Sequence, residues 1–144
     1  MIRLGLYALG VNFVWEMLQA PLFVGMLEMP RWDATALCLR AAAGDAVMIA
    51  IAFAVVALGT RDPTWMLRPL PGRLGAFALL AALQGLALEW LSLRLERWTY
   101  GPDMPVEPLL GLGLSPILQW LVLPIAILWT LRRRELRSST AGAA

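Results

Sequence analysis

Three carboxylic acids, Glu16, Asp45 and Glu89, each stand within a run of otherwise apolar residues. An ionisable side chain inside a membrane helix costs about 3 kcal/mol on insertion scales, so we expect all three to face a protein interior. A carboxyl group in a dry chamber keeps its proton and can protonate a double bond or an epoxide, and a second, ionised carboxylate can then accept a proton. We therefore expect Glu16 and Glu89 to act as acid and base, in either order, with Asp45 as their orienting partner.

Tryptophans and amides accompany these acids. Trp15, Trp90 and Trp120 directly adjoin Glu16, Glu89 and Gln119 in the sequence. Aromatic faces stabilise a passing carbocation, although tryptophan also serves as an anchor at membrane interfaces, and both alternatives stay open. The residues predicted to bind substrate are Asn12, Trp15, Gln19, Arg40, Trp90, Arg94, Trp98, Tyr100, Gln119 and Trp120.

The composition indicates that membrane helices position these side chains. Of the 144 residues, 60% are hydrophobic and 15% are charged, which lies outside the range of ordinary soluble domains. Four apolar segments are long enough to cross the hydrocarbon core. The sequence predicts an all-α, polytopic membrane protein, with a four-transmembrane-helix bundle in residues 1–131 and a basic, disordered cytoplasmic tail in residues 132–144. The helices are expected at about 4–26, 37–58, 74–95 and 112–131.

Arginines are distributed unevenly between the two ends of these segments. One end carries eight of them: Arg3, Arg61, Arg68, Arg73, Arg132, Arg133, Arg134 and Arg137. The other end carries four: Arg31, Arg40, Arg94 and Arg97. The positive-inside rule therefore predicts that both termini are cytoplasmic. The basic tail is either a topological anchor or a site for lipid head groups or a partner.

With this orientation, each predicted helix places its most polar side chain at one level. Counted from the cytoplasmic ends, the depths are about 18 to 22 Å for Glu16, Asp45, Glu89 and Gln119. Spacing puts Asn12, Glu16 and Gln19 on one face of the first helix. On the third helix, the small residues expected to lead up to the carboxyl form the face Ala78, Ala82, Gly85, Glu89 and Ser92. Arg40 and Arg94 are expected to neutralise a carboxylate across the bundle.

The connection between the third and fourth segments has too many prolines to be a floppy linker. It contains Trp98 and Tyr100, and it either folds over the polar layer as a lid or forms an aromatic belt at the interface.

Residue types that are missing exclude several kinds of site. The chain has no histidine and one cysteine, Cys38. This excludes histidine-ligated metal chemistry, multi-cysteine metal sites, an internal disulfide and histidine-dependent nucleophilic catalysis. We expect no metal, no cofactor and no nucleic-acid partner.

The motifs NFVWEMLQAPL, AGD and RWTYGPDMP, followed by GLGLSPILQWLVLP, resemble those of a family of small four-helix proteobacterial inner-membrane proteins. The resemblance covers most of the chain and implies a multi-pass protein of the bacterial inner membrane. More loosely, a small bundle with carboxyls and tryptophans at one level is similar in kind to membrane sterol isomerases of the emopamil-binding type and to integral-membrane terpenoid cyclases.

Three functions remain open on this basis. The first is an enzyme, an intramembrane isomerase or cyclase, that binds or converts an apolar, isoprenoid-like membrane lipid. The second is a non-catalytic binding or assembly subunit of a homo-oligomer or larger membrane complex, in which the polar layer fixes the bundle. The third is an ion or proton pathway, which intramembrane carboxylates often mark.

Overall fold

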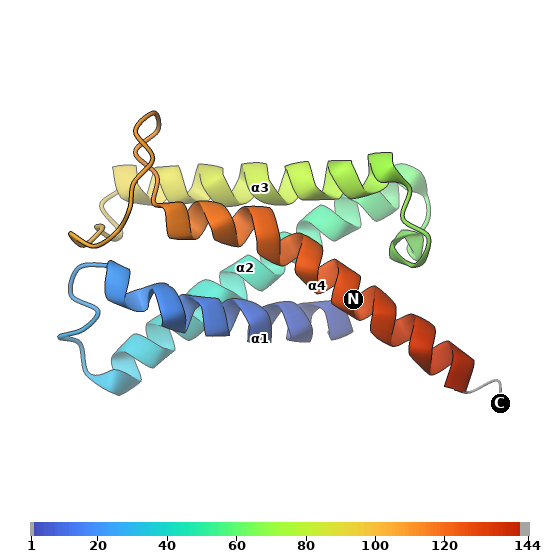
Figure 1. Cartoon of the computed structure of the whole chain (residues 1–144), viewed down its shortest axis with the longest axis horizontal. Coiled ribbons are helices and arrows are strands. Elements are labelled where there is room, and N and C mark those ends of the chain that lie inside the picture. Colours follow the sequence, from blue (N-terminus) through green and yellow to red (C-terminus); the bar gives the residue numbers. More distant parts are fainter. Residues whose placement is uncertain (1, 142–144) are drawn as a thin grey trace.

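In the computed structural model, which describes residues 2–141, four helices run lengthwise and are joined at alternate ends of the molecule (Figure 1). No strand occurs among these residues, which confirms the all-α prediction. The beginning of α1 and the end of α4 lie at the same end, together with the α2–α3 connection. The elements are α1 (Ile2–Gln19), η1 (Ala20–Leu22), α2 (Arg31–Thr60), η2 (Trp65–Leu67), α3 (Pro71–Arg94) and α4 (Leu114–Ala141).

Within the described part of the chain, three helices, α2, α3 and α4, are long and apolar enough to cross a membrane. This agrees with the prediction of a multi-pass membrane protein. Helix α1 has 18 residues, and its length corresponds to about 27 Å. Its polar side chains Asn12, Glu16 and Gln19 lower its hydropathy, so a fourth span remains a prediction.

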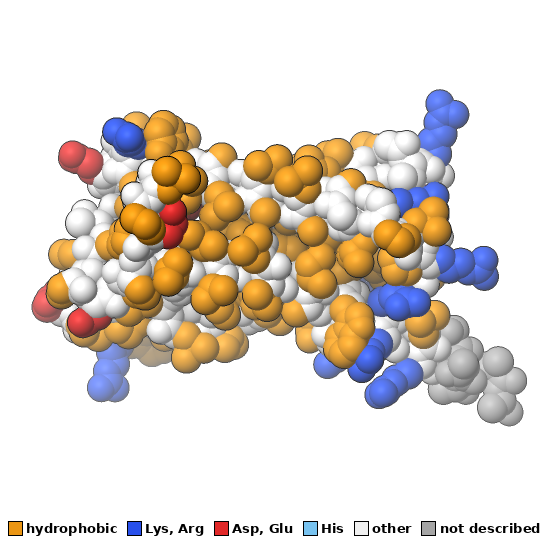
Figure 2. All heavy atoms as spheres, turned by 45° about the horizontal axis from the view of Figure 1, so that its top comes forward, with side chains coloured by type: hydrophobic (Ala, Val, Ile, Leu, Met, Phe, Trp, Pro, Cys, Tyr) orange, Lys and Arg blue, Asp and Glu red, His pale blue; other side chains and the backbone are white. Residues whose placement is uncertain are grey.

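The distribution of side chains on the surface also fits a membrane protein. Figure 2 shows apolar side chains along the middle of the visible face and basic side chains gathered near the C-terminal end. The visible acidic side chains lie at the opposite end. An apolar band between two charged ends is the surface that a bilayer requires.

Two helix boundaries differ from the prediction near proline and glycine. Helix α1 ends at Gln19 rather than at about residue 26, because Pro21 lies in the first turn of η1 and Gly25 takes a positive φ of 79°. Helix α2 starts at Arg31, directly after Pro30, and not at residue 37. The chain therefore leaves the α-helix over residues 20–26, where the apolar pattern had predicted it, and the connection of residues 20–30 begins with η1.

The basic tail was predicted to be disordered from residue 132, but α4 continues as a helix to Ala141. Arg133 stacks on Trp129, with its guanidinium carbon 3.4 Å from the ring centre. Arg3 pairs with Glu135 at 2.8 Å, which joins the beginning of α1 to this extension. These contacts stabilise the extension of α4, and a helix prediction based on the length of apolar segments does not take them into account.

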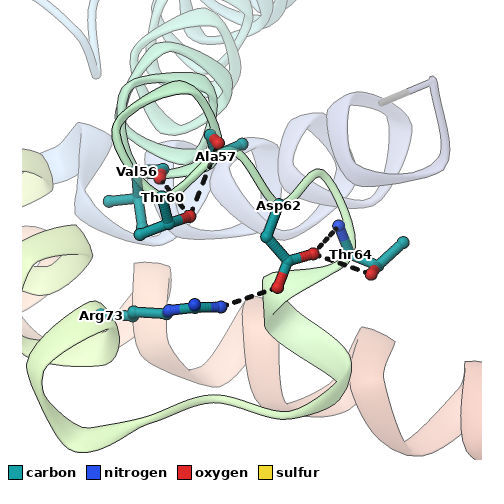
Figure 3. A network of polar contacts seen from close by, with 6 residues as sticks. All are labelled: Val56, Ala57, Thr60, Asp62, Thr64 and Arg73. Atoms are coloured by element: carbon teal, nitrogen blue, oxygen red, sulfur yellow. Dashed lines mark hydrogen bonds and ion pairs between the residues drawn. The ribbon is translucent and has the colours of Figure 1, made fainter.

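We call the end of the molecule that holds the beginning of α1 and the end of α4 the inner end, and the opposite end the outer end (Figure 1). The inner connection, residues 61–70, joins α2 to α3 and is held by a compact polar network (Figure 3). Arg61 closes α2 in the left-handed conformation, with φ of 52°. Asp62 accepts hydrogen bonds from the backbone and hydroxyl of Thr64, both at 2.9 Å, and from Arg73 at 2.7 Å. This network positions Trp65, which is fully buried between Phe53 and Phe77 at ring distances of 5.2 and 5.7 Å.

Candidate functional site

A cavity of about 320 Å³ lies where the outer ends of all four helices meet. Its polar wall contains all three predicted catalytic carboxyls, Glu16, Asp45 and Glu89. The rest of the wall is mostly apolar or aromatic and comes from α2, α4 and the connections at residues 20–30 and 95–113: Ala20, Phe23, Val24, Met26, Met29, Leu37, Cys38, Ala41, Arg97, Trp98, Pro116 and Trp120. A mostly apolar cavity with a few convergent polar groups has the character of a small-molecule binding site.

Gln119 of α4 joins the polar groups of α1 and α2. Its side-chain nitrogen Nε2 lies 2.9 Å from Glu16 Oε1, 2.8 Å from Asp45 Oδ2 and 3.1 Å from Asn12 Oδ1. Its oxygen accepts a hydrogen bond of 3.0 Å from Gln19 Nε2. One amide therefore connects three helices in the polar layer.

A count of protons shows that this layer needs one more donor than its amides supply. An amide NH₂ group has two protons, whereas Gln119 Nε2 faces three acceptor oxygens. Glu16 Oε1 and Asp45 Oδ2 both lie within 2.9 Å of this one nitrogen, so the two carboxyls are close neighbours. Two neighbouring carboxyls do not readily ionise together. Neither carboxyl forms an ion pair within the described residues. The geometry thus fits a Glu16–Asp45 pair that shares a single proton.

Glu89 of α3 is surrounded differently. Its Oε1 atom accepts a hydrogen bond of 2.6 Å from the Tyr100 hydroxyl and one of 3.2 Å from Trp98 Nε1. Two donors on one carboxylate oxygen stabilise its ionised form. Burial, followed by the hydrogen bond to Glu89, raises the pKa of Tyr100, which therefore keeps its proton for this bond.

The two outer connections, residues 20–30 and 95–113, form a cap that is fastened by an antiparallel bridge between Phe23 and Tyr100. Val24 N–H donates to the Thr99 carbonyl at 2.9 Å, and Gly101 N–H donates to the Leu22 carbonyl at 2.8 Å. The cap therefore places Trp98 and Tyr100 directly on Glu89.

Two glycines allow close contacts around the cap and the cavity wall. A Cβ atom on Gly113 would lie 2.8 Å from the Met104 sulfur, beneath the cap. A Cβ atom on Gly85 would lie 1.9 Å from the Trp120 ring. The indole of Trp120 therefore packs directly on the backbone of α3 at Gly85, where any larger residue would clash. The buried face of α3 differs partly from the predicted one. Gly85, Glu89 and Ser92 are buried as expected, but the inner half of the face consists of the buried residues Phe77 and Ala81.

The predicted site residues fall into three groups. Seven line the cavity: Glu16, Gln19, Asp45, Glu89, Trp98, Gln119 and Trp120. Three stand behind that wall and hydrogen bond to residues that line it: Asn12, Trp15 and Tyr100. The remaining three lie outside the site, with exposed side chains: Arg40, Trp90 and Arg94.

The expected charge neutralisation by Arg40 and Arg94 is wrong. The described residues contain ion pairs of Arg3 with Glu135 and Arg73 with Asp62, and neither pair involves a carboxyl of the polar layer. Arg94 instead lies over its helical neighbour Trp90, at 5.1 Å from the ring centre. The acids are accommodated by hydrogen bonds and a shared proton rather than by cations.

Several residues of the site were not singled out from the sequence. Cys38 and Ala41 line the cavity at seven and four residues before Asp45, so helical spacing could have found them. Ser115 donates a hydrogen bond of 2.8 Å to Gln19 Oε1, and it precedes Gln119 by one turn. Arg97 also lines the cavity, but nothing in the sequence pattern distinguishes it from the other arginines.

No protein-family model, curated protein or solved structure matches the chain. Across residues 2–141, no three His, Cys, Asp or Glu side chains are grouped as ligands of a metal ion would be. A functional proposal therefore depends on the cavity and on the chemistry of the groups in its wall.

Proposed function

We propose that the protein binds an apolar, isoprenoid-like lipid in this cavity and isomerises or cyclises it by acid–base chemistry. The observation that carries the proposal is the pairing of two unlike carboxyl environments in one apolar cavity. Glu16 and Asp45 lie against one amide nitrogen with no cation beside them among the described residues, which favours a shared proton. Glu89, in contrast, accepts hydrogen bonds from two donors, which favour its ionised form. Groups poised in opposite protonation states are what a proton donor and a proton acceptor need.

In the proposed reaction, the Glu16–Asp45 pair donates its proton to one carbon of a double bond. The neighbouring carbon becomes a cation, which the faces of Trp98 and Trp120 stabilise. Glu89 removes a proton from an adjacent carbon, so that the double bond re-forms in a new position or after ring closure. The substrate neither gains nor loses atoms, and the proton on Glu89 returns to the pair before the next turnover.

The test combines lipid identification with isotope exchange. Organic extracts of the purified protein are analysed by mass spectrometry, and the enriched lipid is then incubated with the protein in deuterium oxide. The wild type should incorporate deuterium into the lipid, because every cycle passes a proton between solvent-exchangeable carboxyls and carbon. Glu16→Gln, Asp45→Asn and Glu89→Gln should each reduce incorporation at least about 100-fold, the lower range expected for loss of a general acid or base.

Glu28→Gln is the matched control, because Glu28 is exposed and lies outside the cavity wall. It should behave like the wild type. Bulk phospholipid alone in every extract, or full deuterium incorporation in both glutamine variants of the cavity, would contradict the proposal.

A non-catalytic assembly role is the alternative that a specific observation favours. The outward face of α3 is apolar and open, with Leu79 and Leu83 exposed by 60% and 58%. In an assembly subunit this face would contact a partner helix. Cross-linking of the protein in native membranes should then give a specific adduct at Leu79, and the Glu89→Gln substitution should disturb that adduct rather than any lipid conversion.

We further propose that α1 is a fourth span and that both termini are cytoplasmic in a bacterial inner membrane. The excess of arginines at the end shared by the two termini supports this orientation. A periplasm-dependent phosphatase fused after residue 144 should be inactive, whereas the same enzyme inserted into the outer connection near Asp103 should be active. The opposite pattern would invert the topology.

A further inference from the structure

The cavity contains one basic side chain among the residues that the structure describes, Arg97. Its backbone N–H donates to the Ser92 carbonyl at 3.0 Å, which fixes the chain just beyond α3. Its side chain is exposed and has no acidic partner among the ion pairs of the described residues. An arginine that lines a cavity without a counter-ion is available to a ligand.

The charged groups of the cavity differ in exposure. Arg97 and Trp98 are exposed, whereas Glu89 and Gln119 are buried and Glu16 and Asp45 are half-buried. An anion placed beside the carboxyl pair would be repelled and would have no cation there. An anionic group at Arg97 would receive charge-assisted hydrogen bonds from a planar guanidinium, the preferred partner of carboxylates and phosphates.

The size of the cavity limits the rest of the ligand. Its volume of about 320 Å³ corresponds to roughly ten water-sized groups, which is room for part of one hydrocarbon chain and not for two chains of a phospholipid. The same cavity wall includes Phe23, Met26 and Met29, whose side chains suit an apolar chain.

We propose that the ligand is a single-chain lipid with one anionic end, a carboxylate or a phosphate, which binds Arg97 while the chain extends toward the Glu16–Asp45 pair. This inference rests on the proposed function, because it names the class of lipid that the same cavity accepts. The head group fixes which carbons of the chain reach the acid, so Arg97 is a positioning residue rather than a catalytic one.

The experiment uses three photoreactive probes with the same chain, carrying a diazirine at the chain end. Their head groups are a carboxylate, a phosphate and an uncharged hydroxyl. The full-length protein is placed in nanodiscs of uncharged phospholipid, and labelling of peptides that line the cavity is measured against probe concentration. For the wild type, the two anionic probes should saturate at lower concentration than the alcohol, and the tighter of the two identifies the natural head group.

Arg97→Gln should raise the half-saturating concentration of the anionic probes about 10- to 100-fold, as expected for loss of hydrogen bonds to a charged group, and leave the alcohol unchanged. Arg97→Lys should give an intermediate value, because it keeps the charge but loses the planar fork. Arg94→Gln is the matched control, since Arg94 is a nearby exposed arginine outside the cavity wall, and it should leave all three probes unchanged.

Two results would overturn the inference while leaving the proposed function intact. One is cavity labelling by the alcohol and the anionic probes at equal concentration in the wild type and Arg97→Gln. The other is an equal loss in Arg94→Gln, which would indicate general surface charge. If no probe labels the cavity, the inference and the lipid-binding function both fail.

Discussion

The inner and outer halves of the bundle bury different kinds of side chain. At the inner end, Phe53, Trp65 and Phe77 form an aromatic contact with no polar partner: the indole N–H of Trp65 is buried without an acceptor among the described residues. By contrast, the buried polar side chains of the described residues lie in the polar layer and toward the outer ends of the helices: Asn12, Gln19, Glu89, Ser92 and Gln119. Gln119 hydrogen bonds to both Asn12 and Gln19, and Glu89 accepts hydrogen bonds from Trp98 and Tyr100.

This difference indicates that the inner half contributes mainly to stability and the outer half mainly to function. Contact between large side chains stabilises a bundle without specifying any chemistry. A hydrogen-bonded layer beside a cavity contributes less stability, but it holds reactive groups in fixed positions. Substitutions in the two halves should therefore have different consequences, and this can be measured.

The largest effect on stability is expected at the inner end. Trp65→Ala removes a fully buried indole from between two phenyl rings and should lower the free energy of unfolding by about 3 to 5 kcal/mol. Reversible unfolding in mixed detergent micelles measures this loss. Trp32→Ala is the control, because Trp32 is 85% exposed and its removal should change stability little. Equal losses for the two variants would break the comparison.

A smaller effect is expected where α3 meets the cavity wall. Gly85→Ala places a Cβ atom within 1.9 Å of the Trp120 ring and should cost about 1 to 3 kcal/mol through overpacking. It should also weaken lipid labelling, because the displaced Trp120 belongs to the cavity wall. Gly75→Ala, where nothing lies within 4 Å of the new Cβ, should be neutral or slightly stabilising.

Between the two halves, one interhelical hydrogen bond offers a weaker test. Gln84 of α3 donates to the Met48 carbonyl of α2 at 3.0 Å. Gln84→Leu should lower stability by only about 0.6 kcal/mol, the average for polar contacts between membrane helices, and leave lipid labelling intact. A loss above about 2 kcal/mol would show that isolated polar contacts, and not aromatic packing, dominate the stability of this bundle.

The smallest effect concerns the inner connection and depends on pH. Hydrogen bonds from Thr64 and Arg73 hold the pKa of Asp62 below its ordinary value of 3.8. A lowered folded-state pKa contributes stability that is present above about pH 4 and lost as the pH falls through the folded pKa. The difference in melting temperature between the wild type and Asp62→Asn should thus be constant near neutral pH and shrink in acid. A difference that grows in acid would contradict the assignment.

The fold was largely predictable because length and hydropathy determine which segments can cross a bilayer. The residues at which the helices begin and end were harder to predict from the sequence. The apolar run Pro21 to Met26 has the composition of a helix, but Pro21 and Gly25 impose dihedral angles that end it. The extension of α4 depends on contacts such as Arg3 with Glu135, which are separated by 132 residues and leave no local signal.

For the site, helical spacing predicted the shared face of Asn12, Glu16 and Gln19, and the structure connects all three to Gln119. Pairing by charge was a poorer guide, because Arg40 and Arg94 are exposed and form no ion pair, among the described residues, with the acids that they were expected to neutralise. The sequence contains the charges but not the rotation of each helix about its axis, and this rotation decides which arginine reaches the cavity.

The bridge between Phe23 and Tyr100 has a consequence for how the molecule is assembled. It joins the connection that follows α1 to the connection that follows α3, so its two sides are made at different times during synthesis. The first two helices are synthesised before the second pair exists, and at that stage the connection between them has nothing to pair with. Tyr100 and Glu89, which are 11 residues apart, both belong to the part of the chain that is made later. The chamber is complete only when α4 brings Gln119 to Glu16 and Asp45, so its parts come from the whole length of the chain.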